Sequence, residues 1–234
     1  MEALIEYRGL LLSGALVTLQ LAAGSLLLAV ALGVVGAWGK LSGSRLARGV
    51  AGAYTTLIRG IPDLVLLLLL YYGGQSLLNA IGQALGAWQY LEIDQLASAI
   101  FAIGLIYGAY MTEVFRGAYL AVPPGQVEAG VACGMTRRLL FRRIIFPQVI
   151  RHALPGFTNT WLVQIKVTAL VSVVGLEDLV YNAYVGGRAV RQPFTFILVV
   201  LIAYLALTAL SQLGLRWVER RYGTHGGDSA VRAA

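Results

Sequence analysis

The chain has 234 residues, of which 58% are hydrophobic and only 12% are charged, with a net charge of +7. Soluble domains of this size carry about twice that share of charged side chains, because they have a large surface to hydrate. The composition therefore excludes an ordinary soluble enzyme, a disordered chain and a coiled coil, and it predicts an all-α integral membrane protein.

Five apolar stretches are long enough to cross about 30 Å of hydrocarbon at 1.5 Å per residue. The first is too long for the core of a cleavable signal peptide and has no basic segment before it, so we expect it to remain as a membrane helix. The five predicted spans are Leu10–Ala37, Pro62–Ile81, Leu96–Phe115, Leu154–Leu176 and Phe194–Val218.

Basic residues predict which side of the membrane each connection occupies. Most of them fall in segments 38–61 and 116–153 and in the tail after the fifth span. By the positive-inside rule, these parts are cytoplasmic, so the N-terminus lies outside and the C-terminus inside. We expect residues 1–222 to form one transmembrane domain and residues 223–234 to form a short cytoplasmic tail.

The third span carries a carboxylate, Glu113, near its cytoplasmic end. Gly104 and Gly108 lie four residues apart and form a small-residue face that lets another helix approach closely. Helical geometry places Glu113 on the face opposite Gly104. Two interpretations are open and compatible: Glu113 pairs with Arg116, three residues later, or it belongs to a substrate path.

The fourth span has Lys166 near its middle. Asn159 shares its face, while Gln164 and Thr168 lie roughly opposite. A helix that is polar on two sides is expected in the centre of a bundle or beside water. Interhelical hydrogen bonds account for Thr168. A buried lysine is better explained by a role in the substrate path or in gating.

Residues 124–147 are too polar to cross a membrane and predict a helix–turn–helix. Pro124 suits a first helical turn, Gly134 a helix end and Thr136 the N-cap of the next helix. We expect Pro147 to end that second helix. It either binds anionic lipid, caps the bundle or docks on a cytoplasmic protein.

This loop resembles the conserved loop of the membrane subunits of bacterial ATP-binding-cassette importers, "EAA…G…I-x-L-P". Gly130 stands where that pattern has a third Ala, and Phe146 stands where it has Leu. Segments 54–73, 107–129 and 159–179 are similar to the branch that takes up polar amino acids. Asp63 after Pro62, together with Glu177 and Asp178, is most similar to the Q-type permease subunit of histidine/lysine/arginine/ornithine transporters. The residues that match the loop pattern are Glu128, Ala129, Gly130, Gly134, Ile144 and Pro147.

The resemblance implies a type I importer permease fold in the bacterial inner membrane, with the loop acting as a coupling helix on an ATPase subunit. It also implies two ATPase subunits and a periplasmic binding protein. The implied substrate is an amino acid, with cationic amino acids as the first candidates. The implied permease partner is a homologous subunit, which would make the pair a heterodimer rather than a homodimer. We expect no nucleic-acid partner.

We expect no catalytic residue, metal site or cofactor in this chain. Cys133 is the only cysteine, the two histidines are too few for a metal centre, and no G-x-x-x-x-G-K-[ST] motif is present. ATP and Mg²⁺ are therefore expected on the partner ATPase.

The candidate residues of the substrate path are charged or amide side chains in or near the spans. An alternative function is an ion-coupled carrier or channel that uses Glu113 and Lys166, although five spans without an inverted repeat are unusual in that class. A membrane enzyme is disfavoured because no catalytic constellation is present. ATP-driven transport in proteoliposomes would separate importer from carrier. The candidate path residues are Glu113, Lys166, Asn159 and Arg59.

Overall fold

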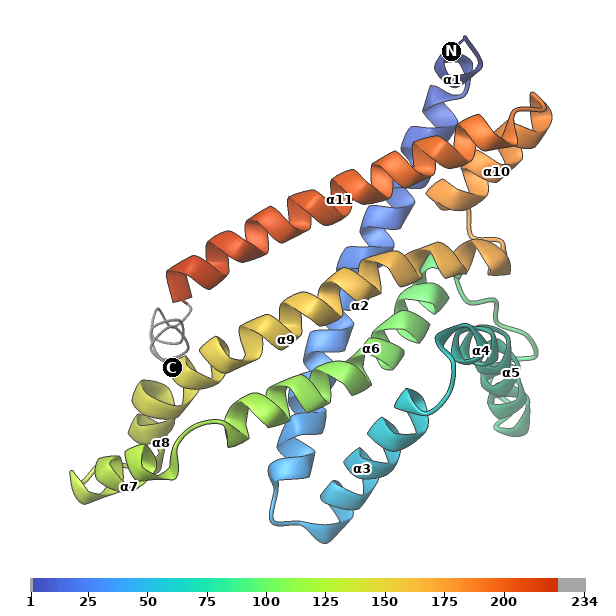
Figure 1. The fold of residues 1–234 in the computed structure, drawn as a ribbon. Coiled ribbons are helices and arrows are strands. Elements are labelled where there is room, and N and C mark those ends of the chain that lie inside the picture. The colour runs from blue at the N-terminus through green and yellow to red at the C-terminus, as the bar shows by residue number, and fades with distance from the viewer. Residues whose placement is uncertain (1, 223–234) are drawn as a thin grey trace.

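The computed structural model describes residues 2–222, and every regular element in that range is a helix (Figure 1). The predicted tail, 223–234, lies outside the described residues. The number of spans predicted from the sequence is confirmed. The five helical runs that are long and apolar enough to cross a membrane are Arg8–Leu41, Asp63–Ala84, Gln95–Leu120, Arg137–Val174 and Pro193–Arg221.

The most extensive helix contact joins α2 (Arg8–Leu41) to α6 (Gln95–Leu120). It uses the small-residue face predicted on the third span. A methyl group built on Gly104 would lie 2.6 Å from the Leu28 side chain, and one on Gly108 would lie 2.8 Å from Leu32 Cβ. Glycine is needed at both positions because the two helices approach too closely for a side chain.

α2 contributes glycines of its own to this contact. A methyl group on Gly33 would lie 2.5 Å from Met111 Cβ, and one on Gly36 would lie 2.2 Å from Thr112 Oγ1. The contacting positions advance in the same direction along α2 and α6, so the two helices are parallel. A short helix, α1 (Glu2–Glu6), precedes them.

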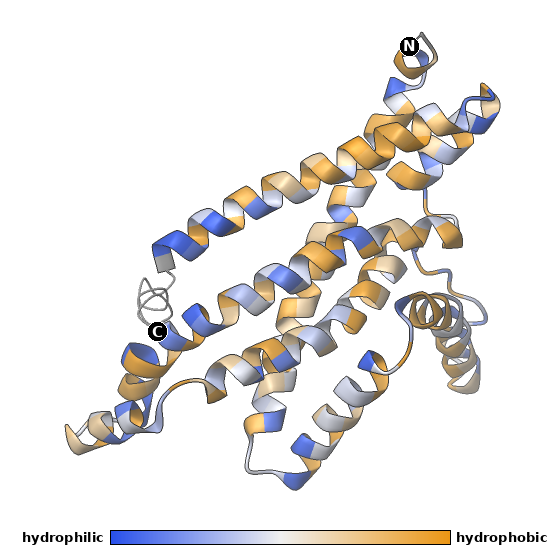
Figure 2. Cartoon of the chain, viewed as in Figure 1, coloured by the Kyte–Doolittle hydropathy of each residue, from blue (hydrophilic) through white to orange (hydrophobic). Residues whose placement is uncertain are grey.

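The core forms where α2, α4 (Asp63–Leu68), α6 and the 3₁₀ segment η3 (Thr168–Val174) meet. α6 is the most buried of the five spans and α11 (Pro193–Tyr222) the least. α11 packs on α10 (Leu179–Ala189) and on α9 (Phe146–Val167). It is apolar along most of its length and becomes hydrophilic toward its carboxyl end (Figure 2). The large apolar side chains that are fully buried in the core include Leu21, Leu67, Ile103, Ile106, Met111 and Val171.

The connecting segment 38–61 contains a helix that packs against the bundle. α3 (Arg45–Arg59) begins at the N-cap Ser44, whose hydroxyl accepts from the Ala47 amide. It is strongly amphipathic, and the Tyr54 hydroxyl donates to the Leu105 carbonyl at 2.6 Å, midway along α6. A turn leads into the second span. This span consists of α4 (Asp63–Leu68), the π-helical turn η1 (Leu69–Gly73) and α5 (Gly74–Ala84).

The helix that contains the fourth span is longer than the predicted span and begins at Arg137, well before Leu154. The prediction that Pro147 ends a helix was wrong. Instead, a single π-helical turn precedes the proline, and its extra residue accommodates the ring and the missing N–H without breaking the helix. The continuous run consists of α8 (Arg137–Leu140), η2 (Phe141–Ile145), α9 (Phe146–Val167) and the 3₁₀ segment η3 (Thr168–Val174).

Candidate functional site: an ion-paired span and a helical corner

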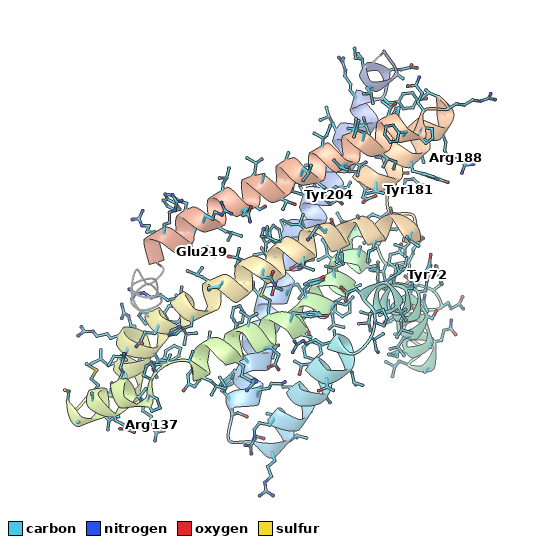
Figure 3. The ribbon with its side chains drawn as sticks, viewed as in Figure 1. Tyr72, Arg137, Tyr181, Arg188, Tyr204 and Glu219 are labelled. Atoms are coloured by element: carbon cyan, nitrogen blue, oxygen red, sulfur yellow. The ribbon has the colours of Figure 1, made fainter. Side chains whose placement is uncertain are left out.

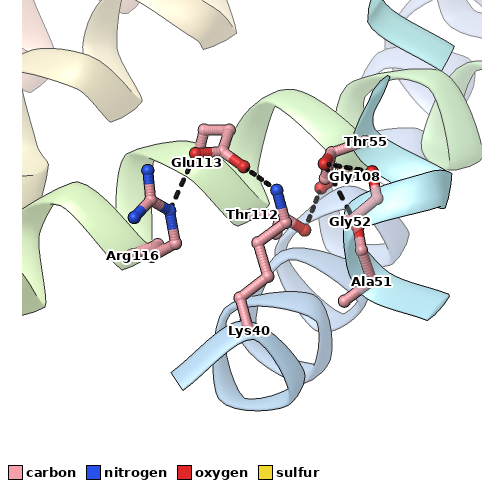
Figure 4. A network of polar contacts seen from close by, with 8 residues as sticks. All are labelled: Lys40, Ala51, Gly52, Thr55, Gly108, Thr112, Glu113 and Arg116. Carbon is pink, nitrogen blue, oxygen red and sulfur yellow. Dashed lines mark hydrogen bonds and ion pairs between the residues drawn. The ribbon is translucent and has the colours of Figure 1, made fainter. Parts of the chain in front are cut away.

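The carboxylate of Glu113 is bound by two cations from two helices (Figure 4). Its Oε1 accepts from the ammonium of Lys40, near the end of α2, and its Oε2 accepts from Arg116 Nε at 2.9 Å. The side chains of Lys40 and Glu113 are only 18% and 20% exposed. Each carboxylate oxygen is thus engaged in a half-buried, charge-assisted hydrogen bond.

The predicted pairing of Glu113 with Arg116 is therefore confirmed, but sequence reasoning missed Lys40. Helical geometry places Glu113 on the face of α6 opposite Gly104, and α2 packs on the Gly104 face. The long side chain of Lys40 on α2 nevertheless reaches the Glu113 carboxylate. The signal in the sequence was a lysine directly after the glycine-rich end of the first membrane helix, where a close helix contact would place its ammonium beside the neighbouring span.

A second charged cluster lies where α3 turns into α4. The guanidinium of Arg59 lies 5.3 Å from the ring centroid of Tyr110, in cation–π geometry. Tyr110 stacks on Tyr107, whose hydroxyl donates to Asp63 Oδ2 at 3.1 Å. The structure thus brings Arg59 and Asp63 to the same pair of aromatic rings. From the sequence, Asp63 supported only the resemblance to Q-type permease subunits, and its proximity to these rings was not predicted.

The polar faces of α9 have different environments. Gln164 is fully buried and donates to Ser25 Oγ at 2.9 Å, and the Thr168 hydroxyl lies 3.1 Å from that of Tyr204. This confirms interhelical hydrogen bonding for Thr168. Asn159 and Lys166, on the other face, are exposed. Among residues 2–222, no carboxylate lies within ion-pair distance of Lys166, so the structure does not join it to Glu113.

The corner between the third and fourth spans begins with α7 (Pro124–Ala132), which has Pro124 in its first turn as predicted. The helix ends in a Schellman motif: the Gly134 amide donates to the Val131 carbonyl at 2.9 Å, and the Met135 amide donates to the Gly130 carbonyl at 3.1 Å. Gly134 has a φ of +74°, a conformation that glycine adopts readily.

The next helix, α8, starts as the sequence predicted. Thr136 is its N-cap, with its hydroxyl 3.4 Å from the Leu139 amide. α7 folds back on this helix at Gly130, where a methyl group would lie 2.4 Å from Leu140 Cδ1 and 2.9 Å from Ile144 Cδ1. The departure from Ala at this position of the loop pattern therefore matches an unusually close approach between α7 and the following helix.

Two hollows of opposite charge flank α7. We call the first the basic cleft; it measures about 480 Å³ and separates α7 from the start of α9. The second, the Glu128 groove, measures about 300 Å³ and is lined by Glu128, Tyr119 and Ile145. The polar residues of the basic cleft are Gln126, Cys133, Arg143, Gln148 and Arg151.

The opposite end of the molecule, where Arg188 lies far from Arg137 (Figure 3), contains a buried acid outside the spans. Asp178 is fully buried and caps α10, its Oδ1 accepting from the Tyr181 amide at 2.8 Å. Its Oδ2 has no partner among the described residues. Burial raises the pKa of Asp178 to about 6, although backbone hydrogen bonds from Tyr181 and Val180 act in the other direction.

Comparison with known proteins assigns this arrangement to a family. The chain is 50% identical over 219 residues to the histidine/lysine/arginine/ornithine transport system permease protein HisQ of Escherichia coli (strain K12), covering 94% of this chain and 96% of that protein. It is 42% identical over 204 residues to the octopine transport system permease protein OccQ of Rhizobium meliloti, covering 87% and 86%.

A solved structure has the same fold. It is described as an amino acid ABC transporter with histidines; it superposes with a TM-score of 0.79 and 31% sequence identity over 93% of this chain and 96% of that one. Residues 18–224 match the family of binding-protein-dependent transport system inner membrane components. The relatives are permease subunits rather than enzymes, and the five apolar helical runs suit a multi-pass inner membrane protein. The chain therefore belongs to the family of inner membrane components of binding-protein-dependent transport systems.

Proposed function

We propose that this chain is a membrane-spanning subunit of an ATP-driven importer for amino acids, with cationic amino acids as the first candidates. The observation that carries the proposal is the 50% identity with a histidine/lysine/arginine/ornithine permease over nearly the whole of both chains. A second relative is named for octopine transport.

The orientation follows from the charges. The N-terminus lies outside and the C-terminus inside, so the corner formed by α7 and α8 faces the cytoplasm. This corner is the coupling element and docks on the ATPase. Its exposed Glu128 and Ala129 and its rigid Schellman turn support that role. The proposed coupling residues are Glu128, Ala129, Gly130, Gly134, Ile144 and Pro147.

The remaining steps belong to other subunits. Two ATPase subunits bind ATP and Mg²⁺, and a periplasmic binding protein delivers the amino acid. A homologous permease subunit completes the path, in a heterodimer rather than a homodimer. Asn159 and Lys166 are exposed on a single subunit. In the proposed assembly, their face of α9 meets the partner permease or the path between the two subunits.

The charged groups of the path have different tasks. Glu113 is already neutralised by Lys40 and Arg116, so it braces α6 against α2 in this arrangement. Arg59 lies on the face of an aromatic ring, without a carboxylate within ion-pair distance among residues 2–222. It is the proposed ligand for the substrate α-carboxylate. The nearby Asp63 is the proposed counter-ion for a cationic side chain.

Transport in proteoliposomes tests the function. The complete complex is reconstituted with its ATPase, its binding protein and internal ATP, and radiolabelled arginine is supplied outside. We expect uptake that requires ATP and persists when ion gradients are collapsed. Uptake that needs no ATP but follows an ion gradient would overturn the proposal and favour a secondary carrier.

A pair of matched variants tests the path. Arg59→Gln removes the guanidinium beside Tyr110, whereas Arg45→Gln removes an exposed one at the other end of α3. We expect Arg59→Gln to reduce uptake at least tenfold while the binding protein keeps its affinity for arginine. Equal uptake by the two variants would remove Arg59 from the path.

A further inference from the structure

The basic cleft beside α7 has a chemistry that the proposed function does not explain. Two guanidinium groups, Arg143 and Arg151, and two amides, Gln126 and Gln148, line it together, and no carboxylate does. Both arginines are exposed, and neither has a carboxylate within ion-pair distance among residues 2–222. Two like charges that share a hollow create a positive potential that favours an incoming anion.

The surrounding sequence strengthens this potential. Residues 121–153 contain Arg137, Arg138 and Arg142 in addition to the two arginines of the cleft, and their only acid is Glu128. Glu128 lines the separate groove on the other side of α7, with Tyr119 and Ile145. α7 is thus flanked by a basic hollow on one side and by a groove with a carboxylate on the other.

The π-helical turn η2 separates apolar from basic side chains. Five residues make slightly more than one π-helical turn, so Phe141 and Phe146 come side by side, with ring centroids 5.9 Å apart. Both line an apolar groove of about 630 Å³ with Trp38 on α2. Arg143, from the same turn, lines the basic cleft instead. The surface suited to lipid chains is therefore distinct from the cleft.

We propose that the basic cleft receives an acidic segment of the ATPase subunit, with carboxylates bound by Arg143 and Arg151. This inference rests on the proposed coupling role of the corner and specifies the charge pattern of its partner. Guanidinium groups bind carboxylates in a fixed, two-pronged geometry. With a cation of the partner in the Glu128 groove, opposite charges on the two sides of α7 fix the orientation in which the ATPase docks.

Cys133 provides a probe of the cleft that needs no substitution. It is the only cysteine of the chain, it is exposed, and it lines the cleft. A sulfonate-bearing thiol reagent should modify it at least threefold faster than a trimethylammonium-bearing one in the permease without ATPase. Adding the ATPase used in the reconstitution should slow both reactions at least tenfold, because the acidic segment covers the thiol.

A matched pair of double variants tests the role of the charges. Arg143→Gln with Arg151→Gln removes two charges from the cleft, while Arg138→Gln with Arg142→Gln removes two exposed charges of the same corner that do not line it. We expect the cleft variant to weaken ATPase binding at least tenfold in neutral detergent and to lose the preference of Cys133 for the anionic reagent. The control variant should change binding less than threefold. Gel filtration and thermal unfolding check that both variants fold.

Three results would overturn the inference. Equal weakening by both pairs would show a diffuse electrostatic attraction, and unchanged binding by the cleft variant would show that the cleft is not used. A defect that appears only in vesicles with anionic lipid would assign the cleft to a lipid headgroup. These outcomes differ from a failure of the proposed function, in which the wild-type permease would neither bind nor stimulate the ATPase.

Discussion

Lys40, near the carboxyl end of the first span, binds Glu113 of the third span although 73 residues separate them in the chain. This ion pair lies next to the glycine contacts that join α2 and α6. The close approach of the two backbones and the half-buried salt bridge are therefore parts of one interface. The salt bridge depends on the glycines, because a wider separation would carry the ammonium away from the carboxylate.

A double-mutant cycle measures that salt bridge. Glu113→Gln leaves Lys40 and Arg116 together without an acid, so it should destabilise the fold more than Lys40→Met, which leaves Glu113 with Arg116. The double variant should recover part of the loss, with a coupling free energy of about 1–2 kcal/mol. Thermal unfolding in detergent is the measurement. Additive effects of the two substitutions would show that the two side chains do not interact.

Gly36→Ala tests the helix contact itself. The added methyl group would lie 2.2 Å from Thr112 Oγ1 and 2.9 Å from Thr112 Cγ2, which are too close to the backbone to move aside easily. We expect a loss of about 1–3 kcal/mol from overpacking. Gly49→Ala on α3, where nothing lies within 4 Å, should instead stabilise the protein by about 0.5–1 kcal/mol. Thr112→Ala should rescue the Gly36 variant, and an absence of rescue would contradict this packing.

Gly134 tests the turn of the corner. A side chain there would meet nothing within 4 Å, so any cost arises from the backbone conformation with φ of +74°. Gly134→Val should cost about 1–2 kcal/mol, while Gly134→Asn should cost less, because asparagine tolerates the left-handed region. ATP-driven uptake should therefore fall more for Val than for Asn. Equal losses would show that the space, rather than the backbone, requires glycine.

Asp178 makes stability depend on pH at the other end of the molecule. Its pKa in the folded chain, about 6, exceeds the ordinary value of 3.8, so the folded state binds more protons between these values. This contribution to stability is fully present below pH 3.8 and is lost as the pH rises to about 6. Asp178→Asn keeps a side-chain oxygen for the N-cap and should be more stable than wild type above pH 6, by roughly 3 kcal/mol at most.

Unfolding of the two proteins across this pH range measures the difference, which should close below pH 4. Glu177→Gln is the matched control, since that neighbouring acid is exposed. If the Glu177 variant shifted the pH profile as much as Asp178→Asn does, the effect would belong to the charge of the loop rather than to the buried carboxyl.

The sequence predicted the elements whose signals are local. Span number follows from runs of apolar residues, and the caps at Thr136 and Gly134 follow from short-range hydrogen bonding and from the φ angles that only some residues adopt. The glycines of the third span revealed a packing face because their spacing matches one turn of a helix. For each of these features, the residues that cause it lie within a few positions of one another.

Features that depend on distant residues were missed. Lys40 and Glu113 meet only because α2 and α6 pack in one particular register, and no residue pattern within either span predicts that register. Arg59 reaches Tyr110 because α3 folds back along α6. Pro147 misled the prediction because proline usually breaks a helix, whereas here the preceding π-helical turn accommodates it. Tertiary packing decided the outcome for Lys40 and Arg59, and a local change of helix type decided it for Pro147.

The π-helical turn Phe141–Ile145 also has a geometric consequence for the corner. It contains one residue more than an α-helical turn, but its residues rotate the chain by smaller steps, so the extra residue is absorbed with little change of direction. In the α-helical parts of the run, each residue instead rotates the chain by about 100° around the helix axis. Removing one residue from the π-helical turn would therefore leave α7 projecting in nearly the same direction. Removing one residue while that turn is retained would rotate α7 by about 100° around the axis of α9, even if every helix still formed.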